Sequence, residues 1–260
     1  MTRIDPAAAV GFARAAEVYE RARASYPPDA VAWLAERCRL GPGRTVVDLG
    51  AGTGKLTRLL PATGARVIAV EPIAEMRALI TDVEAPEGTA EAIPLPDGTA
   101  DTIVVAQAFH WFDHDRALPE LHRVLSAGGR LGLIWNSRDL DDPLQGALEE
   151  LLVPLRRRVS DQQSGAWRPP LEASPLFGAV EEASFPFAQS FTADDLCERV
   201  ASTSFVAAAT PHEREELLAR VRALTVGLEA PFPFRYRTDV YVIPRSGDQG
   251  ADGRGTSIQG

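Results

Sequence analysis

The stretch Thr45–Leu60, TVVDLGAGTGKLTRLL, decides the fold. A short apolar run leads into Asp48, and three glycines then follow at alternate positions, Gly50, Gly52 and Gly54. The leucines that come after them are spaced for a helix. Glycine is needed where the backbone turns sharply, and where a ligand must approach the main chain without meeting a Cβ atom. We therefore predict a strand, a tight glycine turn and a helix, with the turn as a ligand cradle.

The spacing of these glycines separates several kinds of nucleotide site. A phosphate-binding P-loop needs four residues between its first glycine and a Gly-Lys pair, and then Ser or Thr. Here three residues separate Gly50 from Gly54, and Leu56 follows Lys55. A dinucleotide site would place its third glycine one position later, which disfavours a nicotinamide dehydrogenase. The carboxylate of Asp48 would repel a pyrophosphate but suits a cationic or amino-bearing ligand.

Two more strands and a helix extend this pattern. Ala65–Val70 is an uninterrupted apolar run, typical of a buried parallel strand, and ends in Glu71. Glu71 follows Asp48 by 23 residues, about where an α/β nucleotide site places the carboxylate that binds ribose hydroxyls. A helix is expected over 72–80, and Asp101 begins another strand. In an open α/β sheet, ligands bind outside the carboxyl ends of such strands.

Several segments resemble the class I S-adenosylmethionine-dependent methyltransferases. DLGAGTG at 48–54 resembles their motif I, GTAEAIPLPD at 88–97 the segment that brackets adenine, and AQAFHWFD at 106–113 their motif IV. RVLSAGGRLGLI at 123–134 matches their next helix, glycine turn and strand. The resemblance is to the small-molecule branch, methyltransferase type 11 and trans-aconitate-methyltransferase-like proteins, and it spans about residues 10 to 138.

The resemblance implies an α/β fold with a doubly wound, mostly parallel, seven-stranded sheet and one antiparallel strand. We expect an N-terminal helical lid at 1–40 and a cofactor-binding core at 41–138. Substrate-cap helices and closing strands would occupy 139–244 of the same domain. The tail at 245–260 is rich in Gly, Asp and Ser, which is typical of disorder.

S-adenosyl-L-methionine is the cofactor that the resemblance implies. The segment YERARASYP at 19–27 resembles a lid entrance in which a Tyr and an Arg lean over the cofactor. The expected cofactor-binding residues are Tyr19, Arg23, Asp48, Gly50, Ala51, Gly52, Glu71, Pro72, Met76, Ala90, Glu91 and Gln107.

Methyl transfer from a sulfonium is an in-line displacement, so the protein must chiefly align the reactants in a dry site. We predict methylation of a small molecule at oxygen, on a carboxylate or a hydroxyl. A hydroxyl would need a base, and His110 is the candidate, as a base or as a substrate contact. The expected substrate residues comprise aromatic walls, polar contacts and an arginine clamp for a carboxylate: Trp111, Trp135, Asn136, Arg138 and Arg14.

Composition limits the possible partners. The 260 residues carry a formal net charge of −9, which argues against a nucleic-acid surface. Cys38 and Cys197 lie far apart, so we expect no disulfide, no metal site and a cytoplasmic location. We expect no membrane span, because no run of 18 apolar residues occurs. A monomer or homodimer is expected, and the alternative function is a non-catalytic cofactor-binding partner or sensor.

Overall fold

The computed structural model describes residues 24–156, 165–207 and 209–247. Three of the expected site residues, Arg14, Tyr19 and Arg23, lie outside these ranges, as does most of the predicted lid and tail. The roles assigned to them from the sequence remain predictions.

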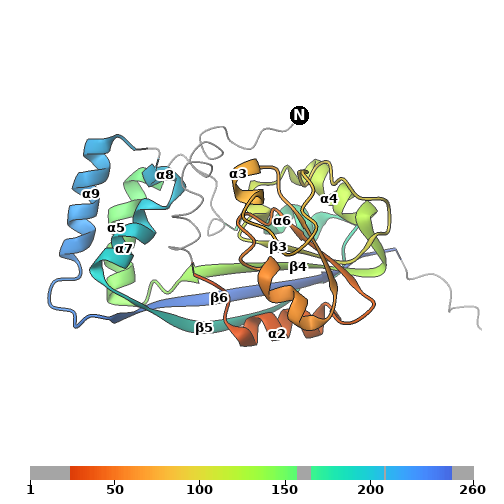
Figure 1. Cartoon of the computed structure of the whole chain (residues 1–260), viewed down its shortest axis with the longest axis horizontal. Helices are drawn as coiled ribbons and strands as arrows, with labels where there is room; N and C mark the ends of the chain where they lie inside the picture. Colours follow the sequence, from red (N-terminus) through yellow and green to blue (C-terminus); the bar gives the residue numbers. More distant parts are fainter. Residues whose placement is uncertain (1–23, 157–164, 208, 248–260) are drawn as a thin grey trace, which may run out of the picture.

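A six-stranded sheet forms the centre of the molecule, in the order β2-β1-β3-β4-β6-β5 (Figure 1). Strands β1, β2, β3 and β4 run parallel, while β6 pairs antiparallel with both β4 and β5. The mostly parallel sheet and its single antiparallel strand therefore agree with the expectation. The strands are β1 Thr45–Leu49, β2 Arg66–Val70, β3 Ala100–Ala106, β4 Leu125–Arg138, β5 Glu181–Phe191 and β6 Phe232–Pro244.

The seventh strand that we expected is absent from the described residues. Its place beside β2 is taken by residues 83–86, which form a single parallel bridge from Glu84 to Ile68. The amide of Ala69 donates to the Glu84 carbonyl at 2.9 Å, but Pro86 has no N–H with which to continue a ladder. The segment thus pairs with β2 through an isolated bridge and does not form a regular strand.

Helices cover both faces of the sheet, as the doubly wound prediction requires. One face packs against α2 Pro28–Arg37 and the 3-10 helix η1 Thr57–Thr63, through residues such as Leu34 and Leu60. The other packs against α4 His114–Val124 and α6 Arg168–Ala173, through Leu121 and Leu171. The short elements α3 Ala74–Arg77 and η2 Phe109–Trp111 lie in loops that follow β2 and β3.

Two helical segments differ locally from the expectation. Pro61 lies within the segment after the glycine turn, which forms the seven-residue 3-10 helix η1 rather than an α-helix. The helix expected over 72–80 shortens to α3. Helix α2 begins at Pro28, with Pro27 as its N-cap, because proline is well suited to the first helical position.

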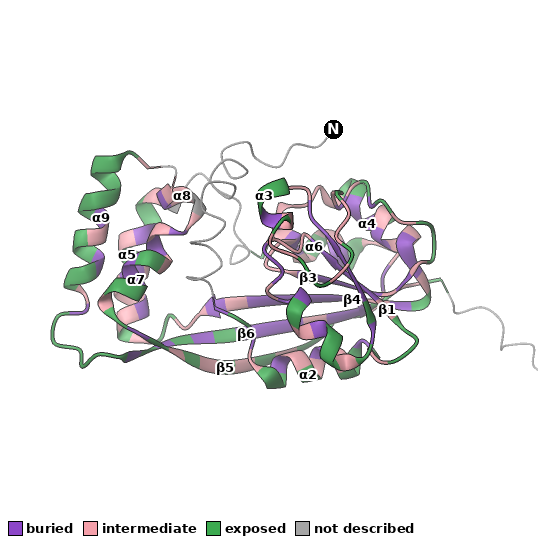
Figure 2. Cartoon of the chain, in the orientation of Figure 1, coloured by how far each residue is buried: buried purple, intermediate pink, exposed green. Residues whose placement is uncertain are grey.

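A helical lobe lies beside this α/β core and contains α5 Pro143–Arg156, α7 Ala193–Ala201, α8 Ser204–Ala207 and α9 Pro211–Ala223 (Figure 1). It has its own hydrophobic cluster, to which β6 contributes Phe234 and Tyr236. Thr192 and Thr210 each begin a lobe helix with a reciprocal capping box. The long strands β5 and β6 run from the core into the lobe (Figure 1). Buried positions recur along β6, whereas β5 is exposed or half-buried up to Phe191 (Figure 2).

No helix in the described ranges has the length and apolar character needed to cross a membrane. Cys38 and Cys197 are both buried free thiols. Burial raises the pKa of Cys38 to about 12, so its thiol stays protonated.

Candidate functional site

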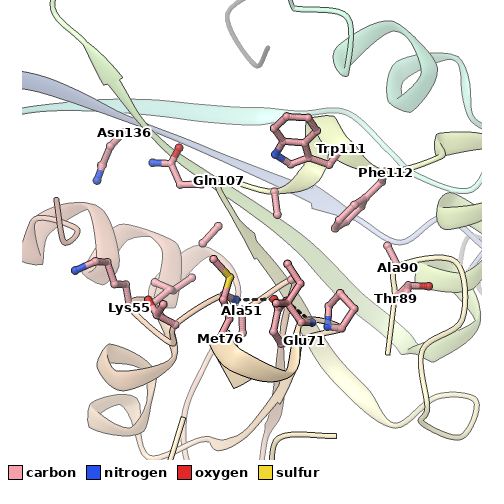
Figure 3. Close-up of a pocket in the computed structure, with 18 of the residues that line it drawn as sticks. Ala51, Lys55, Glu71, Met76, Thr89, Ala90, Gln107, Trp111, Phe112 and Asn136 are labelled. Atoms are coloured by element: carbon pink, nitrogen blue, oxygen red, sulfur yellow. Dashed lines mark hydrogen bonds between the residues drawn. The ribbon is translucent and has the colours of Figure 1, made fainter. Parts of the chain in front are cut away.

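A cavity opens at the carboxyl ends of the parallel strands, where open α/β sheets bind ligands. Residues that follow β1, β2 and β3 line it, together with residues of β4 and β6. Among the lining residues are most of those predicted from the sequence: Gly50, Ala51, Gly52, Glu71, Pro72, Met76, Ala90, Glu91, Gln107, Trp111 and Asn136. Figure 3 shows several of them facing a common space.

The glycine turn after β1 forms the floor of the cavity. Gly50 and Gly52 have φ values of 68° and 58°, in the left-handed region that side chains disfavour. A Cβ on Gly50 would lie 3.0 Å from the Cβ of Ala108. A Cβ on Gly52 would have Met76 Sδ at 4.0 Å as its sole neighbour within that distance among the described residues, so a side chain there would fill the cavity. The turn therefore lets a ligand reach the backbone.

Glu71 lies directly after β2, at the end of the cavity that Met76, Ala90 and Glu91 also line. We call this part of the cavity the nucleoside end. The two carboxylate oxygens of Glu71 accept hydrogen bonds from the amides of Gly52 and Ile73, at 2.8 and 2.9 Å, shown as dashed lines in Figure 3. Each oxygen keeps a further lone pair for a ligand hydroxyl. Burial raises the pKa of Glu71, while the two amides and Arg77 oppose that rise. The carboxylate is therefore fixed in place and able to accept from a ribose.

Asp48 lies beneath the turn rather than at the cavity surface. It is fully buried, and its Oδ2 accepts a 2.6 Å hydrogen bond from Thr57. Its Oδ1 has no hydrogen-bond partner among the described residues. Burial raises the pKa of Asp48 to about 7, opposed by the Thr57 hydrogen bond and increased by the charge of Glu71. The structure thus corrects the prediction of direct ligand contact: Asp48 supports the segment that holds the turn.

The opposite wall of the nucleoside end is apolar. Met76 is 4% exposed, and Ala90 lies beside Glu91 on the loop at 88–97. Oε1 of Glu91 accepts from the amide of Asp113 at 3.0 Å, which ties this loop to the start of α4. Phe112 completes the wall and packs edge-on against Phe109 at 5.6 Å between ring centroids. The arrangement suits a flat heterocycle with a polar edge.

Gln107 and Asn136 lie on the other side of the turn (Figure 3). Gln107 has a φ of 59°, rare for a residue with a side chain, and its amide donates to the Ile134 carbonyl at 3.0 Å. Asn136 accepts from the Thr238 hydroxyl at 2.7 Å and donates to the Ser25 carbonyl at 3.0 Å. Asn136 therefore fixes the backbone that enters α2 against the rim of the cavity.

Three predicted substrate or catalytic residues do not line the cavity. Trp135 is 1% exposed and packs on Trp167, because successive strand residues point to opposite faces and Asn136 takes the cavity side. Arg138 forms an ion pair with Glu149 of α5. His110, on η2, lies outside the lining, and its ring is 4.8 Å from that of Trp111. The structure therefore does not show Arg138 as a clamp for a substrate carboxylate.

The cavity also contains residues for which the sequence analysis proposed no role at the site, or only ordinary packing. Tyr26 and Lys55 lie close in sequence to predicted segments, whereas Arg199 of α7 and Tyr236 of β6 come from the helical lobe. Lys55 directly follows the glycine turn, a position that could have signalled a site residue. No motif marks Arg199 or Tyr236, because their positions depend on how distant elements pack.

The residues fit S-adenosylmethionine at the nucleoside end. The positive-φ glycines leave room for a ligand against the backbone, and the fixed carboxylate of Glu71 matches a ribose. The apolar wall of Met76 and Ala90, with Glu91 at its edge, matches an adenine that bears an amino group.

Comparison with known proteins agrees with this geometry. Residues 47–133 match the family model described as Methyltransferase domain. An uncharacterized methyltransferase of Mycobacterium tuberculosis strain H37Rv is 40% identical over 223 residues, covering 83% of this chain and 85% of that protein. An uncharacterized methyltransferase-like protein of Schizosaccharomyces pombe is 33% identical over 208 residues, 78% of this chain and 81% of that protein.

Two further similarities are more limited. The ubiquinone/menaquinone biosynthesis C-methyltransferase of Escherichia coli is 37% identical over 121 residues, which is 41% of this chain and 48% of that protein. A solved structure from Anaeromyxobacter dehalogenans, described as a type II methyltransferase, has a TM-score of 0.62 at 22% identity, covering 86% of this chain and 97% of that chain. That structural likeness supports the fold. The glycine turn, the fixed carboxylate and these relatives together show that the chain belongs to the class I S-adenosylmethionine-dependent methyltransferases.

Proposed function

We propose that this enzyme methylates an oxygen atom of a small molecule, and that the oxygen belongs to a carboxylate. The observation that most supports a small-molecule acceptor is the extent of the cavity. It continues past Gln107 and Trp111 to Asn136, and on to Arg199 and Tyr236 of the lobe. Neighbouring strands lie about 4.8 Å apart, so the four steps from β2 to β6 span about 19 Å. That length accommodates a cofactor and a small acceptor end to end.

The protein's own residues would bind the cofactor at the nucleoside end. Glu71 would accept hydrogen bonds from the ribose hydroxyls, and Gly52 would let the cofactor lie against the backbone. Met76 and Ala90 would pack on the adenine, with Glu91 at its edge. When bound, S-adenosylmethionine supplies an electrophilic methyl group. The residues beyond Gln107 would then hold the acceptor in line with it.

A carboxylate fits the chemistry of this cavity better than a hydroxyl. The carboxylates among the described lining residues are Glu71 and Glu91, and both already accept backbone hydrogen bonds at the nucleoside end. His110 does not line the cavity. A carboxylate acceptor is ionised at neutral pH and needs no base. An oxygen lone pair would form the new O–CH3 bond while the C–S bond pair returns to sulfur, giving an ester and a neutral thioether.

Two measurements test the proposal. Calorimetry should show binding of S-adenosylhomocysteine and no binding of NAD; binding of neither would contradict it. Incubation with isotope-labelled S-adenosylmethionine and a metabolite extract, followed by mass spectrometry, should give a labelled product that mild alkali hydrolyses to labelled methanol. A labelled product that resists alkali would contradict the carboxylate, and would indicate a methyl ether formed on a hydroxyl or methylation at carbon, the reaction named for the Escherichia coli relative.

A further inference from the structure

The end of the cavity that faces the lobe contains two polar side chains, Arg199 of α7 and Tyr236 of β6. Helix α7 is fixed in the lobe by Leu196 and Val200, which are 0% and 2% exposed. This packing leaves Arg199 at the cavity wall. The two residues come from elements far apart in sequence, and both line this cavity.

Tyr236 is held rigidly but its hydroxyl is not paired. The side chain is 2% exposed, its ring stacks on Phe187 at 5.1 Å, and Phe234 packs edge-on at 5.2 Å. Within the described part of the chain, the hydroxyl has no hydrogen-bond partner. The same is true of the buried Nε–H of Arg199. Two unmatched donors therefore belong to side chains that line one cavity.

Unmatched buried polar groups are uncommon in native proteins, because they have lost water without gaining a partner. A phenylalanine and a methionine would fill the same space without that cost. A guanidinium can only donate hydrogen bonds, and a phenol donates one readily. The partner that satisfies both groups is thus an oxygen-bearing ligand that accepts hydrogen bonds.

The charge distribution makes that ligand an anion. No acidic side chain of the described ranges forms an ion pair with Arg199, and the lining carboxylates Glu71 and Glu91 accept backbone amides at the nucleoside end. The cofactor that the family uses carries a positive sulfonium. Cations that share a site of low dielectric repel one another strongly, and a negative group between them removes this repulsion. A planar carboxylate also matches the fork of a guanidinium.

We propose that Arg199 and Tyr236 form an anion-binding subsite that holds a carboxylate of the acceptor. This inference rests on the proposed methyltransferase function, because the subsite is part of the same cavity. Leu56 and Trp111, also in the lining, give the acceptor an apolar body to pack against. The lobe would thus select acidic acceptors with a hydrophobic portion.

The test measures binding of defined probes to the enzyme saturated with S-adenosylhomocysteine. The probes are benzoate and octanoate, with benzamide and octanamide as neutral molecules of the same shape. We expect the carboxylates to bind at least 10-fold more tightly than the amides. Arg199→Met should weaken carboxylate binding at least 10-fold, Arg199→Lys by less, and Tyr236→Phe about 3- to 10-fold, with amide binding unchanged.

Matched controls separate this effect from loss of charge or folding. Arg220→Met removes the same charge from an exposed position on α9, and Tyr241→Phe removes a hydroxyl from the same strand outside the cavity. Both should bind the carboxylates like the unaltered enzyme. All variants should bind S-adenosylhomocysteine normally.

The outcomes distinguish the two proposals. Failure of the unaltered enzyme to bind S-adenosylhomocysteine would contradict the proposed function. Normal S-adenosylhomocysteine binding with no preference for carboxylates, or with a preference that survives Arg199→Met, would overturn the subsite alone.

Discussion

The two ends of the cavity differ in how far their polar groups are matched within the protein. At the nucleoside end, both oxygens of Glu71 already accept backbone amides, and Glu91 accepts the amide of Asp113. At the lobe end, the Tyr236 hydroxyl and Arg199 Nε–H have no partner among the described residues. Where the ligand is common to a whole family, the fold itself can supply the hydrogen bonds that fix the binding groups. Where the ligand is a particular acceptor, the binding groups are left to form their hydrogen bonds with that acceptor.

The buried acid beneath the turn gives the largest expected effect, and it concerns stability. The folded-state pKa of Asp48, about 7, lies above its ordinary value of 3.8. Between these values the folded state holds a proton that the unfolded state releases, so stability falls as pH rises from about 4 to about 7. We expect Asp48→Asn to remove this loss, worth up to roughly 4 kcal/mol.

Urea unfolding of both proteins without cofactor, from pH 4 to pH 8, measures this difference. Glu71 also titrates in both, so the quantity to compare is the gap between the two stability curves. The gap should widen in favour of Asp48→Asn up to about pH 7 and then level off. A gap that stays constant with pH would show that Asp48 is ionised throughout.

Removal of the carboxylate at the nucleoside end should have nearly as large an effect, now on binding. Glu71→Ala should weaken S-adenosylhomocysteine about 100-fold, or about 3 kcal/mol, since hydrogen bonds to a charged group are lost. Glu71→Gln, which keeps one acceptor oxygen, should lose about 10-fold. Carboxylate probes at the lobe end should respond far less. If calorimetry shows that Glu71→Ala weakens S-adenosylhomocysteine and the carboxylate probes equally, the two ends of the cavity do not bind separate ligands.

The backbone of the glycine turn gives an intermediate effect. Gly50→Ala puts a Cβ 3.0 Å from that of Ala108 at a φ of 68°, so the turn must shift. We expect about 10-fold weaker S-adenosylhomocysteine binding and roughly 1 kcal/mol of lost stability. Gly41→Ala is the matched control, because a Cβ there would meet no heavy atom of the described chain within 4 Å. If both variants bind alike, close backbone approach is not needed.

Arg138 should show the smallest effect on ligand binding, and its removal should act on stability instead. Arg138→Met leaves Glu149 without the guanidinium that it pairs with, at a site where the two side chains are 11% and 17% exposed. We expect a loss of about 1 to 2 kcal/mol in urea unfolding, recovered in part by a second change, Glu149→Leu. Octanoate binding should stay within 2-fold. A 10-fold loss of octanoate affinity would instead indicate that Arg138 contacts the acceptor.

The nucleoside end could be predicted because its information is local. Gly50, Gly52 and Glu71 each follow a strand that the apolar pattern identifies, and parallel strands end on one edge of a sheet. Asp48 shares that pattern, but whether its carboxylate faces a ligand or the protein interior depends on Thr57 and on the packing of η1. Sequence spacing does not specify that choice.

The lobe end could not be predicted, because its residues meet through tertiary packing. Arg199 and Tyr236 line the same cavity as Gln107 only when α7 and β6 pack beside the core. Both Trp135 and Asn136 were expected at the cavity and only Asn136 lines it, since the face to which a strand residue points depends on register. The seventh strand is missing where Pro86 interrupts the pairing with β2. This effect could be predicted only by knowing which backbone amides face β2.

The path of the chain between β4 and β6 has a consequence for engineering. After α5 in the lobe, the chain returns to the core, where Trp167 and Leu171 pack in the same cluster as Leu121 of α4, before β5 leads back to the lobe. A chimera that replaces residues 143–231 as one cassette would therefore remove part of the core as well as the acceptor end. Exchange of acceptor specificity between relatives needs two separate grafts, with Trp167 and Leu171 left in place.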